Sequence, residues 1–229
     1  MEKNKTGKYL KYAVGEIILV VIGILIALQI NNWNEIRKLR IEETSHLLEL
    51  KSNLEVTLDN FKKDTIYNFK SIEKLRSIEY YIEQDLAYSS VLDSAFGMFG
   101  SWRSPYPITT SYTTLKTKGL DAISNSTLRN QIVNMYEYEF VILSKDYDQG
   151  EWKILEVANP FLYKHIRAKN SKQAARPNDF EYLKNEKEFS NILSKIIGQR
   201  EFGIDNYKRI MATIEQLIQS ISTEIESRS

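Results

Sequence analysis

The chain has 229 residues, of which 42% are hydrophobic, and it contains no Cys. Its 31 Lys and Arg nearly balance 30 Asp and Glu, and a net charge of +1 at pH 7 argues against nucleic acid as a partner. Without Cys, neither a disulfide nor a lipoprotein cysteine is available, which fits an oxidising compartment.

An apolar run near the N-terminus predicts a membrane-spanning helix. From Ala13 to Ile30, twelve of eighteen residues are Ile, Leu or Val, and only Glu16 and Gln29 are strongly polar. Eighteen residues cover about 27 Å, close to the ~30 Å hydrocarbon core of a bilayer. Each aliphatic residue favours insertion by about 0.3 to 0.6 kcal/mol, whereas one carboxylate costs ~2.5 to 3.5 kcal/mol. We therefore expect a transmembrane helix over residues 12–33.

The flanks of this run bear on its processing and orientation. A cleavable signal peptide is the nearest alternative, but no small-x-small site follows around Ala27, so we expect an uncleaved anchor. Four lysines precede the run, and Arg37, Lys38 and Arg40 follow it. This weak excess favours a cytoplasmic N-terminus, with residues 1–11 as a cytoplasmic tail and the long remainder outside the cytoplasm.

One face of the expected membrane helix is suited to packing against another helix. At 100° per residue, six residues lie within about 40° of one direction: Glu16, Val20, Gly23, Ala27, Ile30 and Asn34. Gly23 and Ala27 form a small-xxx-small pair, which lets two backbones approach closely in lipid. Three interpretations of Glu16 remain open: a side chain that reaches the cytoplasmic interface, a carboxyl between associated copies, or part of a proton or ion path.

Three stretches in this region resemble a known family. They are KYLKYA at residues 8–13, GEI at residues 15–17 and LQINNWNE at residues 28–35; a looser similarity covers residues 114–128. The family consists of single-pass membrane proteins of flavobacteria and their relatives and is known only as a domain of unknown function. The resemblance implies an anchor in a bacterial inner membrane with a periplasmic helical domain, and it supplies no catalytic residues.

A long helix is expected to follow the membrane span. No Gly or Pro occurs between Gly23 and Gly97, and the apolar residues keep steps of three and four, which predicts a stalk helix over residues 34–88. Residues 89–111 break this pattern with two Gly, two Pro and several aromatics. This segment is either a packed cap at the tip of a bundle or a recognition surface, and we favour the cap because exposed aromatics would promote aggregation.

Further helices are expected in the remainder, residues 89–229. One runs from Tyr112 to Gly119, and the next begins with Ser126 as a plausible N-cap and ends at Pro160. A polar connection should then lead to a helix capped by Asp179.

The last helix is expected after a turn or hinge bracketed by Gly198 and Gly203. The sequence thus predicts an all-α fold: an N-terminal transmembrane helix continuing into a long stalk helix, followed by a periplasmic helical bundle.

Residues suited to catalysis or metal binding are few. The only histidines, His46 and His165, lack metal-ligand spacing, and there is no nucleophile elbow or phosphate-binding loop. We therefore expect no enzymatic activity, no cofactor and no metal.

A run of basic residues without an intervening acid is the remaining candidate site. It comprises Lys164, Arg167, Lys169, Lys172 and Arg176. It is either a solvated loop or a contact surface for anionic headgroups or an acidic partner.

The leading hypothesis is a non-enzymatic inner-membrane protein. It would self-associate through its membrane helix as a homo-oligomer and present its periplasmic domain as a scaffold or adaptor to envelope proteins. The alternative is a membrane-anchored sensory or ligand-binding module that acts through a membrane partner. Membrane lipid is a partner in both cases, and nucleic acid in neither.

Overall fold

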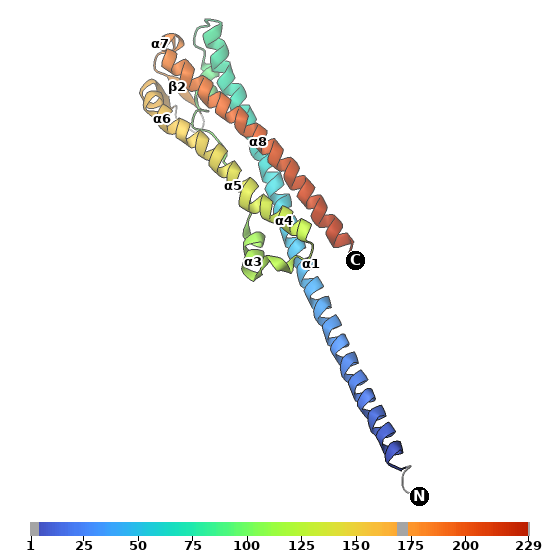
Figure 1. Cartoon of the computed structure of the whole chain (residues 1–229). Helices are drawn as coiled ribbons and strands as arrows, with labels where there is room; N and C mark the ends of the chain where they lie inside the picture. Colours follow the sequence, from blue (N-terminus) through green and yellow to red (C-terminus); the bar gives the residue numbers. More distant parts are fainter. Residues whose placement is uncertain (1–4, 169–173, 229) are drawn as a thin grey trace. The chain divides into compact units, whose positions relative to one another are not determined.

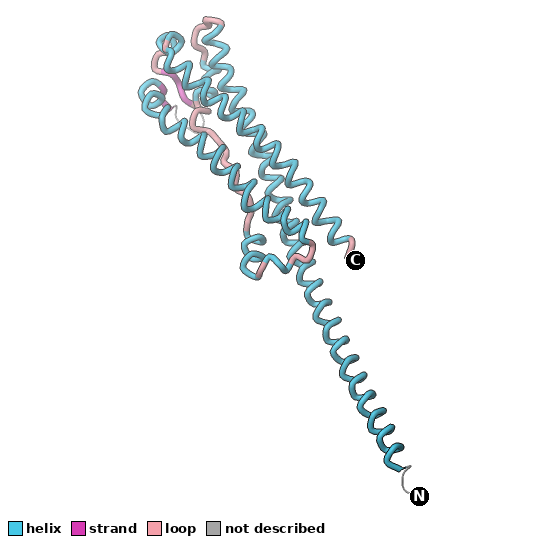
Figure 2. The backbone as a smooth tube through the Cα atoms, viewed as in Figure 1, coloured by secondary structure: helices cyan, strands magenta, loops and turns pink. Residues whose placement is uncertain are grey.

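The structure, a computed structural model, describes residues 5–168 and 174–228 (Figures 1 and 2). These residues are mostly helical, and the predicted all-α class is confirmed. They divide into two compact units between Leu47 and Leu48.

Helix α1 (Lys5–Glu83) begins in the first unit. Its side chains from Val14 to Ile30 are all exposed. Among the described helices, α1 alone has the length and apolar composition to cross a membrane, which is compatible with a single-pass membrane protein. The helix ends at Glu83, five residues before the predicted end, and Asp85 then adopts a left-handed φ of 48°, which Asp tolerates better than most residues.

The second unit contains the hydrophobic core, where α8 (Lys187–Glu226) packs with the end of α1 and with α6 (Gln149–His165). The buried Phe61 ring meets the Tyr207 ring edge-on at 5.2 Å, which joins α1 to α8. Full burial of such a side chain stabilises the fold by about 1.5 to 3 kcal/mol. Ion pairs at the surface run along the same two helices, for example Lys62 Nζ to Glu215 Oε1 at 3.0 Å.

The segment after α1 is packed against this core. It contains the short helices η1 (Ser90–Leu92) and α2 (Asp93–Phe96). Phe96, Phe99 and Trp102 are buried, and the Phe96 ring stacks on Phe189 of α8 at 6.3 Å, whereas Tyr106 is exposed. The expected packed cap therefore holds for three of its four aromatic residues.

Helix α3 (Thr110–Lys118) and the turn η2 (Leu120–Ala122) precede a long helical stretch. This stretch consists of α4 (Ser126–Asn134), the π-helical turn η3 (Met135–Glu139), α5 (Phe140–Ile142), the π-helical turn η4 (Leu143–Asp148) and α6.

Two expectations about this stretch are wrong. Its N-cap is Asn125 and not Ser126, because Asn125 Oδ1 accepts hydrogen bonds from the N–H groups of Thr127 and Leu128, both at 3.1 Å. Pro160 does not end α6, which continues to His165. Proline removes one backbone donor, and the buried Phe161 and Leu162 hold the following turn against the core.

The predicted hinge in the last helix is also wrong. Helix α8 runs without interruption through Gly198 and Gly203. At Gly203 the missing side chain serves packing, because a Cβ atom there would overlap the buried ring of Tyr147. A glycine in the middle of this helix therefore marks a close approach between elements and not a bend.

A small hairpin and a short helix lie between α6 and α8. Strands β1 (Ile166–Ala168) and β2 (Ala175–Pro177) are antiparallel, with Arg167 opposite Arg176. The polar connection predicted from His165 to Asn178 thus contains two short strands that the sequence pattern did not predict. Helix α7 (Phe180–Asn185) begins as predicted at Asp179, whose Oδ1 accepts a hydrogen bond from the Tyr182 N–H at 2.9 Å.

Candidate functional site

The predicted membrane packing face lies entirely on α1. Its six residues, Glu16, Val20, Gly23, Ala27, Ile30 and Asn34, are all exposed. A Cβ atom added at Gly23 would meet no atom within 4 Å, and the same holds at Gly15. The face is thus open along its length, and its use in self-association stays a prediction.

The basic run is only partly gathered in the structure. Lys164, at the end of α6, and Arg167, on β1, are exposed. Arg176 Nη2 lies 3.2 Å from Asp93 Oδ2, so this guanidinium is already paired within the fold. Lys169 and Lys172 lie outside the described residues. Among the residues of this run that the structure describes, Lys164 and Arg167 are thus the exposed ones, and a role of the run in binding an anionic partner stays a prediction.

A buried ion pair that the sequence pattern did not predict lies in the core. Arg200 of α8 and Glu151 of α6 both have side chains that are 0% exposed. Arg200 Nη2 lies 2.7 Å from Glu151 Oε1, and Arg200 Nε donates to the same oxygen at 2.8 Å. A signal was present, since Arg200 falls on the apolar stripe of α8 between Ile196 and Ile204.

The remaining donors of Arg200 hold two further segments. Nη1 donates to Ser71 Oγ of α1 at 2.7 Å and to the Met98 carbonyl at 2.9 Å. Nη2 also donates to the Phe99 carbonyl at 2.7 Å. The guanidinium thus donates four hydrogen bonds, and its ion pair with Glu151 adds a fifth close polar contact. Arg200 connects α1, α6, α8 and the segment after α2, and full burial makes it a structural link instead of a catalytic group.

Several polar atoms around this link lack a hydrogen-bond partner within the described chain. They are Trp102 Nε1, Tyr147 Oη, Asp148 Oδ1 and Glu151 Oε2. Burial raises the pKa of Glu151 despite the opposing effect of Arg200, and burial likewise raises the pKa of Tyr147. The π-helical turn η4 lies directly before α6 and supplies Tyr147 and Asp148 to this region. Such turns often occur where function or packing needs a side chain redirected.

A hollow that combines apolar and charged residues lies at the surface between α6 and α8. Its volume is about 590 Å³, within the range of small-molecule sites. Its lining residues are Lys153, Ile154, Val157, Ala158, Glu188, Asn191, Ile192 and Lys195. We call this hollow the α6/α8 groove. Among its lining residues, Ala158 is buried.

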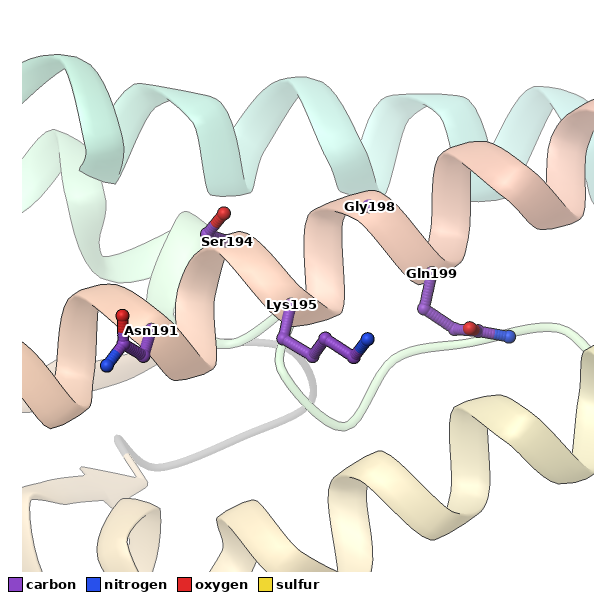
Figure 3. Close-up of a pocket in the computed structure, with 5 residues that line it drawn as sticks. All are labelled: Asn191, Ser194, Lys195, Gly198 and Gln199. Carbon is purple, nitrogen blue, oxygen red and sulfur yellow. The ribbon is translucent and has the colours of Figure 1, made fainter.

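A smaller, polar pocket of about 310 Å³ adjoins this groove and shares Asn191 and Lys195 with it. Its other lining residues are Ser194, Gly198 and Gln199, and Figure 3 shows Lys195 and Gln199 projecting toward the side of α6. Gln199 Nε2 donates to the Tyr147 carbonyl at 3.3 Å, which fixes the inner wall. The two hollows together offer apolar, cationic and amide groups in one place.

In the described part of the chain, no group of three or more His, Cys, Asp or Glu residues is placed to hold a metal ion. Comparison with protein families matches residues 16–186 to one described as "Family of unknown function (DUF6090)". No curated protein and no solved structure matches the chain.

Proposed function

Because this chain belongs to DUF6090, a family of unknown function, its role must be inferred from its own residues, and we propose that it is a membrane-anchored scaffold or adaptor. In this proposal it has no enzymatic activity and crosses a bacterial inner membrane once. The N-terminus is cytoplasmic, and the helical unit is presented to envelope proteins in the periplasm. Copies associate through the packing face of α1.

The exposed apolar run on α1 carries this proposal. Every side chain from Val14 to Ile30 is exposed, and the most apolar window of the helix has no buried residue. Each methylene transferred from water to an apolar surrounding contributes about 0.8 kcal/mol. Twelve aliphatic side chains therefore strongly favour lipid over water, whereas the core helix of a soluble protein would be covered by its own chain.

Self-association is supported by the open small-residue face. Gly23 shares this face with Glu16 and Ala27, and nothing lies within 4 Å of a Cβ atom added there. Close contact with a second copy would bury the small residues and would place Glu16 against protein instead of lipid.

The chain offers a matched control for this part of the proposal. Gly15 also lies in the apolar run with nothing within 4 Å, but it points about 100° away from Glu16 on the helix. We expect light scattering of the full chain in detergent to give an oligomeric mass, Gly23→Ile to reduce it to the monomer, and Gly15→Ile to leave it unchanged. A monomeric wild-type protein would remove self-association from the proposal.

Orientation is tested separately. A reporter that is active only outside the cytoplasm, fused to the C-terminus, should be active in cells, whereas a fusion to the N-terminus should not. The reverse pattern would place the helical unit in the cytoplasm and would rule out periplasmic partners.

The α6/α8 groove favours a second candidate function, a ligand-binding module that signals through a membrane partner. Thermal-shift measurements on the full chain with small anions, amino acids and sugars would test it. A stabilising shift is expected for at least one class, because a ligand that binds only the folded state stabilises that state. The absence of any shift would leave the scaffold as the better proposal.

A further inference from the structure

We propose that the α6/α8 groove binds an amphipathic carboxylate, an alkyl chain with a single anionic headgroup. The alkyl chain would lie in the groove, and the headgroup would lie at the end where the polar pocket adjoins it. The inference rests on the second candidate function, ligand binding, and is independent of self-association through α1.

The wall of the groove indicates an apolar ligand. Val157 is 82% exposed although its side chain is wholly apolar, and it lies beside Ile154 and Ile192 in the same hollow. Single exposed aliphatic residues are common on protein surfaces, but several that line one concave surface mark a binding site. A sugar or a nucleotide would leave these side chains without a matching surface, whereas an alkyl chain would cover them.

The charges of the groove indicate an anion. Lys153 and Lys195 line it from opposite helices, and neither has an ion pair within the described residues. Other cations of the same unit are paired, for example Lys184 with Asp85 at 2.7 Å and Arg209 with Glu139 at 2.6 Å. Glu188 is the single acidic residue of the lining. Two cations against one anion leave a net positive charge that a carboxylate complements.

The adjoining pocket indicates where the headgroup lies. Lys195 and Asn191 belong to both hollows, and the polar pocket adds the Gln199 amide, which projects from the same side of α8 as Lys195 (Figure 3). An ammonium group and amide N–H groups are donors suited to carboxylate oxygens. The apolar groove and the polar pocket thus form two ends of one site, which matches a molecule with an apolar end and an anionic end.

The test uses the full chain in phosphatidylcholine nanodiscs and octanoate as the probe, measured by calorimetric titration with empty nanodiscs subtracted. Octanoate should bind saturably and more than tenfold more tightly than butanoate. A fully buried methylene group raises the affinity about fourfold, and each of the four additional methylene groups of octanoate should contribute less than this because the groove is open on one side. Octanol, with the same chain and no charge, should bind at least threefold more weakly than octanoate.

Variants at the surface keep the fold intact and locate the site. Lys153→Gln and Lys195→Gln should each weaken octanoate binding about threefold, and the double variant about tenfold, while octanol binding stays the same. Lys187→Gln is the matched control, since Lys187 is an exposed lysine of α8 that does not line the groove. It should leave the affinity for octanoate unchanged.

Three results would overturn the proposal: no saturable octanoate binding, equal binding of octanol and octanoate, or an unchanged affinity in the double variant. If a second copy covers the groove instead, octanoate will not bind and Val157→Asp will lower the oligomeric mass. The Gly23→Ile measurement does not involve this groove, so failure of the ligand inference and failure of self-association are distinguishable.

Discussion

Two glycines of helix α8 should respond to the same substitution with opposite signs. A Cβ atom at Gly198 would meet nothing within 4 Å, whereas one at Gly203 would overlap the Tyr147 ring. In a helix interior, replacing Gly by Ala is worth about 0.8 to 1 kcal/mol. We therefore expect Gly198→Ala to stabilise the protein by about 1 kcal/mol.

At Gly203 the same helical gain is outweighed by steric overlap. Tyr147 is fully buried and packs edge-on against Trp102 at 5.1 Å and Tyr207 at 5.8 Å, so its ring has little room to move. Overpacking a tight core costs about 1 to 3 kcal/mol, and the surrounding rings place this position at the upper end of that range. After the helical gain is subtracted, Gly203→Ala should destabilise the protein by about 2 kcal/mol.

Thermal unfolding of the full chain in one detergent, followed by circular dichroism, measures both changes. For a chain of this size, about 1 kcal/mol shifts Tm by roughly 2 to 4 °C. Gly198→Ala should therefore raise Tm by about 2 to 4 °C, and Gly203→Ala should lower it by about 4 to 8 °C. In a chain that already carries Tyr147→Leu, Gly203→Ala should lower Tm by less than it does in the wild-type chain, because the ring that the added methyl group would overlap is gone. Equal Tm values for the two glycine variants would refute the packing argument.

Three further substitutions test other contacts. Arg200→Met should cost about 3 to 5 kcal/mol in the free energy of unfolding, because it leaves the buried Glu151 carboxylate unpaired; a loss below 1 kcal/mol would contradict this role. Asn125→Ala should cost about 1 kcal/mol in the same measurement, since two backbone donors lose their acceptor. The hydrogen bond from the Lys116 ammonium lowers the pKa of Glu137 below its ordinary value of 4.5. The stabilisation that the Glu137 carboxylate gives the folded protein is therefore present above pH 4.5 and is lost as the pH falls through the folded-state pKa of Glu137. Glu137→Gln should therefore lower Tm relative to the wild type at neutral pH and leave it unchanged in acid. The same difference in Tm at both pH values would refute the stabilising role of the Glu137 carboxylate.

The fold class could be predicted because it depends on composition and periodicity. The run without Gly or Pro after Gly23 and the apolar spacing along α1 both survive in the structure as one helix to Glu83. Asp179 was predicted as a cap because its side chain needs only the local backbone to act as one. Features that depend on neighbours in sequence were therefore largely accessible, although the cap at Asn125, which is just as local, was assigned one residue too late to Ser126.

Features that depend on distant neighbours were not accessible. Gly203 looks like a hinge until the Tyr147 ring, 56 residues earlier in the chain, occupies the space beside it. The place of Arg200 on the apolar stripe of α8 signals burial, but its partners Glu151, Ser71 and two carbonyl groups come from distant parts of the chain. The groove between α6 and α8 likewise exists only once the two helices are packed. Tertiary contacts decided each of these cases, and one sequence read alone contains no record of them.

The way in which Arg200 holds the segment after α2 affects how that segment can diverge. Two of its hydrogen bonds go to the carbonyl oxygens of Met98 and Phe99, which every amino acid possesses. Replacements at these two positions alter the side chain and leave the acceptors in place. Met98 and Phe99 are themselves buried, so the apolar packing of their side chains, and not the hydrogen bonds of Arg200, limits which residues these two positions accept. The Arg200 guanidinium and the Glu151 carboxylate, in contrast, each depend on the charge of the other.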